Sequence, residues 1–167
     1  MLYLLDANVL IDANRDYYPI ERVPEFWSWL EDLGRRGVVK IPLETYDEIR
    51  VGSDALATWS KKTETEEALV FEEEAVLALV QRATEEGYGR NLTDVQLERI
   101  GRDPFLVAYC LLDPLGRCIV TTEGSRPRAQ AHNRHLPDVC GTFGIQCVHT
   151  YQLTRDLDFS TSWNRRS

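Results

Sequence analysis

Short runs of consecutive apolar residues recur along the chain between longer polar and mixed segments. The first run covers residues 2–5 and leads directly into Asp6. Other, mainly apolar runs cover residues 38–41, 118–121 and 145–148. Apolar runs of this length are typical of strands that are buried on both faces of a parallel sheet. We therefore expect four strands, of which the first and the third are buried, and the first ends at an aspartate.

Between these runs, apolar residues recur at spacings of three and four, which predicts amphipathic helices. The clearest helix covers residues 24–36 and begins with a proline, a residue favoured in the first turn. Further helices are expected at residues 43–50, 54–62, 63–83, 93–100, 103–112 and 136–143. Many glutamates crowd the 63–83 segment, and we interpret them as a solvated helix face. Helices that alternate with buried strands predict an α/β fold with a mostly parallel central sheet.

Composition is consistent with one folded domain. The chain has 167 residues, of which 43% are hydrophobic and 28% are charged. We expect a single domain over residues 1–158, followed by a polar tail over residues 159–167. No run approaches the roughly 18 apolar residues of a membrane span, and the first strand leaves no room for a signal peptide. A cytoplasmic protein without membrane contact is expected. Its four cysteines lack a CxxC pair and are interpreted as reduced core residues.

Four acidic residues lie where the expected topology could bring them together. Asp6 ends the first strand, and Glu48 lies on the helix after the second strand. Asp103 begins the helix that leads to the third strand, and Glu123 follows that strand. Ligands in open α/β sheets bind at the carboxyl ends of the strands. We therefore expect these four side chains to converge on one cleft.

Converging carboxylates repel each other unless a cation lies among them. Oxygen ligands without a nearby histidine or cysteine suit Mg²⁺ or Mn²⁺. Such an ion stabilises the charge that builds up on a phosphate during cleavage. The pattern therefore indicates metal-assisted hydrolysis of a phosphodiester.

Each of these acids could also serve the fold alone. Asp6 and Asp103 both precede helical segments, so each could act as an N-cap. Glu44 competes with Glu48, because it lies one turn earlier on the same face of the same helix. Glu123 could equally be a loop acid without a task.

Four short motifs, in this order, resemble the PIN domain family of metal-dependent ribonucleases. Each is short, and together they extend over residues 1–123. They are LDANVLI at residues 5–11, EIRVG at 48–52, DPFLVA at 103–108 and VTTE at 120–123. A fifth element, PDVC at residues 137–140, is similar to a branch of small bacterial and archaeal PIN-like proteins. The resemblance implies a three-layer α/β/α sandwich and a Mg²⁺- or Mn²⁺-dependent endoribonuclease.

The resemblance also implies roles for the matching acids. Asp6, Glu48 and Asp103 would hold the metal directly or through water. Glu123 stands where the family usually has aspartate, so this chain departs from the pattern at the fourth acid. The longer side chain could move that metal position, or Asp138 could supply the carboxylate instead.

Groups around the acids receive supporting roles. Asn8 and Thr121 would orient the carboxylates by hydrogen bonding. Arg126, Arg128 and Arg134 belong to a basic loop and would contact RNA, although a solvated surface explains such a loop as well. The net charge of −8 argues against a nucleic-acid partner, but a bound divalent ion would offset it at the site.

Several partners and rival functions follow. Small PIN proteins include toxins of toxin–antitoxin pairs, so an antitoxin and a homodimer are expected partners beside RNA; Phe26, Trp27 and Trp29 offer aromatic surface for a dimer. A PIN-like module that binds RNA or protein without turnover is one alternative, and a structure-specific DNA nuclease is another. A phosphatase that uses Asp6 as nucleophile usually needs a second aspartate two residues on, where this chain has Asn8.

Overall fold

Five parallel strands form the centre of the fold in a computed structural model that describes residues 1–165. Their order across the sheet is β3-β2-β1-β4-β5, so the first strand in the chain lies in the middle. The strands are β1 (Leu2–Leu5), β2 (Val39–Pro42), β3 (Val70–Phe71), β4 (Arg117–Thr121) and β5 (Gln146–His149). All pairs of neighbouring strands are parallel, which confirms the expected α/β class.

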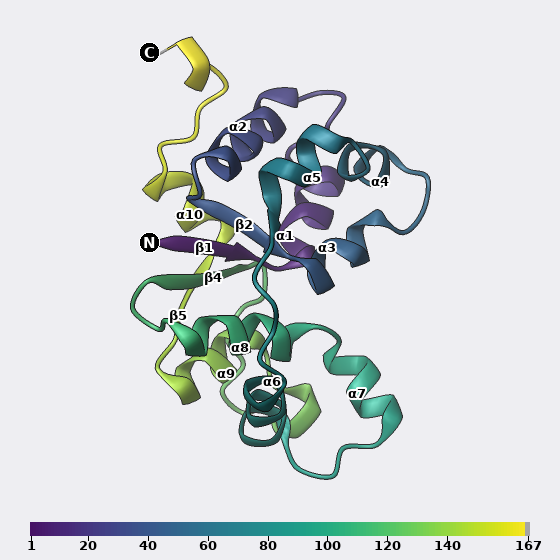
Figure 1. The fold of residues 1–167 in the computed structure, drawn as a ribbon, viewed down its shortest axis with the longest axis vertical. Helices are drawn as coiled ribbons and strands as arrows, with labels where there is room; N and C mark the ends of the chain where they lie inside the picture. Colours follow the sequence, from purple (N-terminus) through teal and green to yellow (C-terminus); the bar gives the residue numbers. More distant parts are fainter. Residues whose placement is uncertain (166–167) are drawn as a thin grey trace.

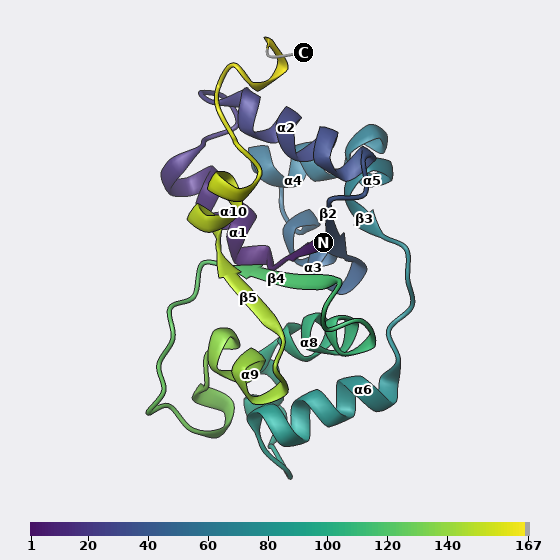
Figure 2. The same ribbon diagram turned by 90° about the vertical axis from the view of Figure 1, so that its left-hand side faces the viewer.

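Helices cover both faces of this sheet, as Figures 1 and 2 show. On one side lie α1 (Ala7–Asp12), α2 (Pro24–Arg35), α3 (Leu43–Arg50), α4 (Ala55–Ser60), α5 (Thr63–Leu69) and α10 (Thr150–Asp156). On the other lie α6 (Leu77–Arg82), α7 (Asp94–Ile100), α8 (Asp103–Leu112) and α9 (Leu136–Phe143). Two π-helical turns, η1 (Ala13–Tyr17) and η2 (Ala83–Tyr88), and two 3₁₀ turns, η3 (Ala131–Asn133) and η4 (Trp163–Arg165), complete the described chain. The arrangement is a three-layer α/β/α sandwich.

Successive residues of the central strands supply two separate cores, because side chains alternate between the faces of a sheet. Leu5 and Val120 belong to the core beneath α1, α2 and α5. Leu4 and Ile119 belong to the core beneath α8 and α9. All four are fully buried, which explains why both strands are apolar at these positions.

The prediction of one helix over residues 63–83 is wrong in the middle of that segment. The chain leaves the helical conformation after Leu69, pairs with β2 through β3, and runs without regular structure to Val76. Glu73 in this stretch forms an ion pair with Arg117, with the closest N–O distance at 2.6 Å. The consecutive acids 72–74 therefore lie on an extended connection rather than on a helix face.

Aromatic residues of α2 are turned inward. Phe26, Trp27 and Trp29 are at most 3% exposed, so they offer no surface for a dimer. The segment expected as a polar tail is also partly docked, since Phe159 and Trp163 pack against this core. Residues 166–167 lie outside the described part of the chain.

Two further expectations concern cysteines and membrane contact. All four cysteines are free, and three of them are buried. Among residues 1–165, none of the helices combines the length and apolar character that a bilayer crossing requires.

Packing of α2 against α5 depends on a close approach at Gly34. A Cβ atom added there would lie 2.5 Å from the backbone oxygen of Ala68 and 2.8 Å from Leu69 Cδ2. Gly34→Ala is therefore expected to lower the free energy of unfolding by about 1–3 kcal/mol, measured by urea denaturation. Gly141→Ala is the matched control, because a Cβ there meets nothing within 4 Å and alanine favours the helix. Equal stability of the two variants would contradict this packing.

Candidate active site at the carboxyl edge of the sheet

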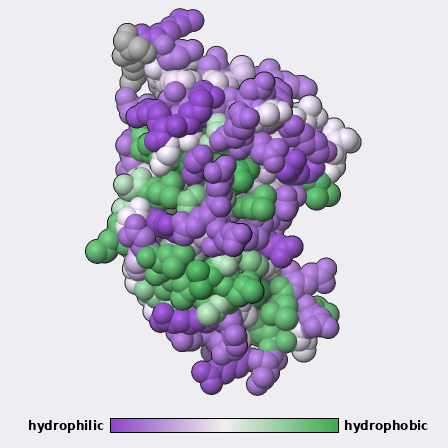
Figure 3. All heavy atoms as spheres, viewed as in Figure 1, coloured by the Kyte–Doolittle hydropathy of each residue, from purple (hydrophilic) through white to green (hydrophobic). Residues whose placement is uncertain are grey.

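Acidic residues from four separate segments line one cavity of about 170 Å³. Asp6 follows β1, Glu48 lies on α3, Asp103 begins α8, and Glu123 lies two residues beyond β4. The carboxyl ends of the strands point to this edge, and Figure 3 shows the surface hollowed there, on the right between the two layers of helices. The structure thus brings together the four acids that the sequence singles out.

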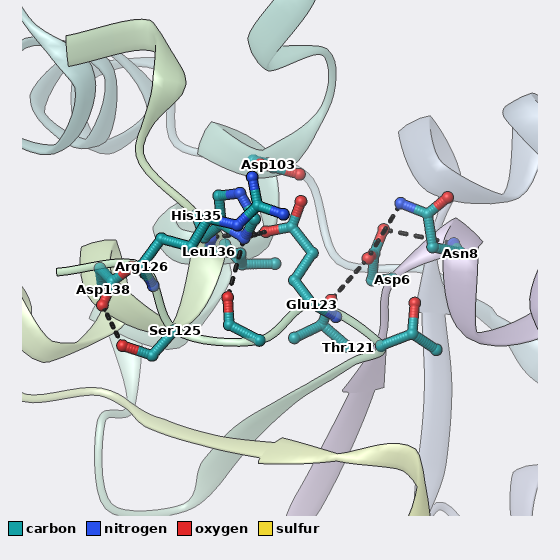
Figure 4. A network of polar contacts seen from close by, with 12 residues as sticks. Asp6, Asn8, Asp103, Thr121, Glu123, Ser125, Arg126, His135, Leu136 and Asp138 are labelled. Atoms are coloured by element: carbon teal, nitrogen blue, oxygen red, sulfur yellow. Dashed lines mark hydrogen bonds and ion pairs between the residues drawn. The ribbon is translucent and has the colours of Figure 1, made fainter. Parts of the chain in front are cut away.

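Asp6 is the most deeply buried of these acids, with 5% of its surface exposed. The hydroxyl of Thr121 donates to its Oδ2 over 2.9 Å, and the side-chain amide of Asn8 approaches the same oxygen at 3.4 Å (Figure 4). The backbone N–H of Asn8 also donates to Oδ1 at 3.5 Å, so Asp6 caps α1 as well. Burial raises the pKa of Asp6, and the nearby charge of Glu123 adds to this effect although the hydrogen bonds oppose it.

Asp103 lies within the first turn of α8 and makes no capping hydrogen bond, because the N-cap position belongs to Arg102. Its carboxylate instead accepts a hydrogen bond of 2.9 Å from the hydroxyl of Tyr88. Burial, followed by the charge of Asp6, raises the pKa of Asp103 to about 8. Smaller contributions come from Glu123 and Glu48. A capping role therefore does not explain this residue.

Glu48 lies at the exposed rim of the cavity. Partial burial of its carboxyl group and the charge of Asp6 raise its pKa, whereas Arg102 opposes the shift. The α7–α8 turn passes close by, where Gly101 has a φ of +54° that side chains rarely adopt. Glu44 points elsewhere and accepts hydrogen bonds of 3.2 and 3.3 Å from the hydroxyl of Tyr109. Glu48 is thus the acid of α3 that lines the cavity.

Glu123 and Asp138 occupy different places. Figure 4 shows the Glu123 side chain between Asp6 on one side and His135 on the other. Its Oε2 accepts a hydrogen bond of 2.7 Å from the backbone N–H of Leu136, the first residue of α9. Asp138 does not line the cavity.

Hydrogen bonds turn the Asp138 carboxylate toward the loop before α9. It accepts from the Ser125 hydroxyl at 2.5 Å and from the backbone N–H of Arg126 at 2.7 Å. Burial acts to raise the pKa of Asp138, but these bonds and the nearby charges of His135 and Arg134 lower it below its ordinary value. The fourth acid of the cavity is therefore Glu123 by position.

The cavity holds polar atoms that suit a hydrated cation. Thr45 lines the same cavity and is 1% exposed, yet its buried hydroxyl oxygen has no hydrogen-bond partner among the described residues. A buried hydroxyl without a partner costs about 1–3 kcal/mol, which a water or ligand in the cavity would relieve. In the described chain no three His, Cys, Asp or Glu side chains are gathered closely enough to hold a metal as placed. The donor set fits Mg²⁺ or Mn²⁺ in its chemistry, with water completing the coordination.

The basic loop divides into two parts. Arg126 and Arg128 are exposed and lie outside the acidic cavity. Arg134 is bound within the protein, where its guanidinium donates to the backbone oxygens of Gly87 and Asp138. It thus braces α9 against η2 rather than reaching freely toward solvent.

Several residues of the cavity are absent from the sequence-based set. Thr45 precedes Glu48 by three positions, a helical spacing that could have shown that they share a face. Arg99 and Arg102 line the same cavity, but no local pattern connects them to Asp6. Tyr88 reaches Asp103 from a π-helical turn that the periodicity did not indicate.

Comparison with known proteins adds a family without a stated activity. A family model described as "Domain of unknown function (DUF4411)" matches residues 3–161. No curated protein matches the chain.

The free energy of unfolding of the metal-free protein should depend on pH, because three of the cavity acids have shifted pKa values. The pKa of Asp103 is about 8 in the folded chain and ordinarily 3.8, so between these values the folded state holds a proton that the unfolded state releases. The free energy of unfolding should therefore fall as pH rises from about 4 to 8. Asp103→Asn removes this titration and is expected to be about 2 kcal/mol more stable than wild type at pH 7.5 in EDTA, by urea denaturation.

Asp138→Asn provides a control of opposite sign. The pKa of Asp138 is lowered in the folded chain, so its contribution is present at neutral pH and disappears as pH falls through that value. This variant should lose stability at pH 7.5. Parallel pH profiles for wild type and Asp103→Asn would contradict the described electrostatics.

Proposed function

We propose that this chain, which belongs to the DUF4411 family, is a divalent-metal-dependent nuclease that hydrolyses phosphodiester bonds in RNA. One observation carries the proposal: four carboxylates from distant segments line a single cavity at the carboxyl edge of a parallel sheet. Three of them, Asp6, Glu48 and Asp103, have raised pKa values, each with a neighbouring acid among the causes. A cation relieves such repulsion, and carboxylate oxygens favour Mg²⁺ or Mn²⁺.

Asp6, Glu48, Asp103 and Glu123 would hold the ion, directly or through water. When bound, the ion supplies positive charge that stabilises the phosphate under attack and makes water a better nucleophile. The protein's own part is to orient the carboxylates. Thr121 fixes Asp6, Tyr88 fixes Asp103, and the backbone N–H of Leu136 fixes Glu123.

Two arginines at the cavity counter the overall acidity of the chain. Arg99 and Arg102 both line it, and Arg102 also lies over the ring of Phe105, with Cζ 5.9 Å from the centroid. Arginine forms paired hydrogen bonds with phosphate, so these side chains can attract and align a nucleic-acid backbone beside the acids. The net charge of −8 therefore does not describe the local field at the site.

RNA as substrate follows from the PIN resemblance of the motifs around Asp6, Glu48, Asp103 and Glu123. An antitoxin partner and a homodimer stay expectations of that resemblance. The four free thiols favour a cytoplasmic location.

Metal binding and RNA cleavage should depend on the same residues. Mn²⁺ is expected to raise the Tm of the wild-type protein by several degrees, because a ligand that binds only the folded state stabilises it. Asp6→Asn and Asp103→Asn should lose this shift and should cut single-stranded RNA at least about 100-fold more slowly. Fluorescence-detected unfolding and a gel assay with labelled RNA measure the two effects.

Glu44→Gln is the matched control on α3, because Glu44 lies one turn from Glu48 but outside the cavity. It should keep both metal binding and cleavage. Mn²⁺ binding without cleavage of RNA or DNA would identify a binding module, and cleavage of DNA alone would identify a DNA nuclease. Absence of Mn²⁺ binding by the wild-type protein would contradict the proposal.

The identity of the fourth acid can be tested separately. Glu123→Gln should abolish Mn²⁺-dependent cleavage, whereas Asp138→Asn should leave it within about threefold, since Asp138 faces Ser125. Glu123→Asp is expected to be slower by roughly tenfold, because the shorter side chain cannot keep the Leu136 contact and also reach the cavity. Loss of cleavage in Asp138→Asn, with activity retained in Glu123→Gln, would reverse the assignment.

A further inference from the structure

A second cavity of about 160 Å³ lies beside the acidic one. The two share the side chains of Arg99, Ile100, Asp103 and Glu123 as a common wall. The rest of the lining consists of Tyr88, His132, Asn133, Arg134 and His135, and we name this space the His/Arg chamber. Its lining is dominated by cationic and N–H-bearing side chains, in contrast to the neighbouring cavity.

Hydrogen bonds fix two of these side chains in place. The guanidinium of Arg134 is held by the backbone oxygens of Gly87 and Asp138 and by the hydroxyl of Thr142. These acceptors are neutral, so they hold the arginine without cancelling its charge. The Nδ1 atom of His135 lies 2.8 Å from the backbone oxygen of Gly124 and donates to it, which fixes the orientation of the ring. The positive charge of Arg134 and the ring of His135 are thus held in position at this wall.

His132 has a ring nitrogen that lacks a hydrogen-bond partner within the described chain, which is a second and independent observation. Its Nδ1 atom is buried and has no hydrogen-bond partner among residues 1–165. The residue before it, Ala131, has a φ of +49°, an unfavourable conformation for alanine that persists only where surrounding structure imposes it. His132 lines the chamber, so a water or a ligand bound there is a candidate partner for this nitrogen.

We propose that the His/Arg chamber binds a phosphate group of the nucleic-acid substrate, next to the phosphate that is cleaved. Ligand pockets for drug-sized molecules usually exceed roughly 300 Å³, so this chamber suits a phosphate group rather than a whole nucleoside. The N–H groups of arginine and of a protonated imidazole are donors that recognise phosphate oxygens. The position beside the scissile bond rests on the proposed function, whereas phosphate binding itself does not.

The shared wall predicts cooperation between the two cavities. Asp103 and Glu123 face both spaces, so their charges oppose an anion in the chamber unless a cation lies in the acidic cavity. Phosphate and Mg²⁺ should therefore each strengthen the binding of the other, as coupled sites must do reciprocally. A phosphate in the chamber and a cation in the acidic cavity would complete one charge-balanced site.

Inorganic phosphate and the three histidines of the chain provide a direct test. In a titration at constant pH and ionic strength, with and without Mg²⁺, the imidazole NMR signals of His132 and His135 should move and saturate. His149 is an internal reference, because it lies at the end of β5 outside the chamber. Equal movement of all three signals, or no movement, would overturn the proposal.

A matched pair of charge changes strengthens this test. Arg99→Gln removes a cation from the chamber wall and should weaken phosphate binding roughly tenfold. Arg36→Gln makes the same change just beyond α2, at a residue that lines neither cavity, and should alter phosphate binding less than about twofold. Equal affinities of the two variants would show that phosphate binds elsewhere.

The source of the phosphate is decided with RNA oligonucleotides of one sequence. A 5′-phosphate, a 3′-phosphate and two hydroxyl ends are compared for binding to the Ca²⁺-loaded protein by fluorescence anisotropy. Tighter binding of one phosphorylated end, lost in Arg99→Gln, assigns the chamber to a chain terminus, and equal binding that Arg99→Gln weakens throughout assigns it to an internal phosphate. Oligonucleotide binding that Arg99→Gln leaves unchanged overturns the role in substrate binding. Failure of RNA cleavage with intact phosphate binding would reject the nuclease and leave the anion site standing.

Discussion

Repulsion among carboxylates at one edge of the sheet is the constraint that the rest of the site is built around. A parallel sheet directs the carboxyl ends of its strands to the same edge, so acids placed after different strands are brought together by topology alone. Burial then removes the water that would screen them, and the pKa values of Asp6 and Asp103 rise. The hydroxyls of Thr121 and Tyr88 hold these two carboxylates in place. Such unfavourable electrostatics, maintained by specific donors, are characteristic of functional sites.

The site lies at the seam between the two cores of the sandwich. Asp6 caps α1 and Glu48 lies on α3, and both helices belong to the layer packed on Leu5 and Val120. Asp103 begins α8, which belongs to the other layer. Every acid position therefore depends on how the two layers sit across the sheet. The His/Arg chamber extends the same seam toward α9, since Glu123 accepts from the first residue of that helix.

The strands and their acids could be predicted from sequence because both signals are local. A fully buried strand needs an apolar residue at every position, and an acid that ends such a run stands out, as Asp6 does. The short strand β3 could not be predicted from the sequence, since its two residues form a strand only because they pair with β2. For the same reason, the ion pair of Glu73 with Arg117, which lies on the extended connection in the expected 63–83 helix, is invisible in the local pattern.

Side-chain direction was the less predictable property. Helical spacing alone does not separate Glu44 from Glu48. In the structure Glu48 lines the acidic cavity, whereas Glu44 binds the hydroxyl of Tyr109. Arg134 lies in a basic loop, and its residue type suggests an exposed side chain that contacts a partner. In the structure, however, a backbone oxygen far away in the sequence, that of Gly87, binds its guanidinium.

Anomalous diffraction from a crystal grown with Mn²⁺ tests the central claim most directly. We expect one anomalous peak within coordination distance of carboxylate oxygens of Asp6 and Asp103, with Glu48 and Glu123 bound directly or through water. A Mn²⁺ peak elsewhere on the protein, with these four side chains uncoordinated at saturating metal, would contradict the account.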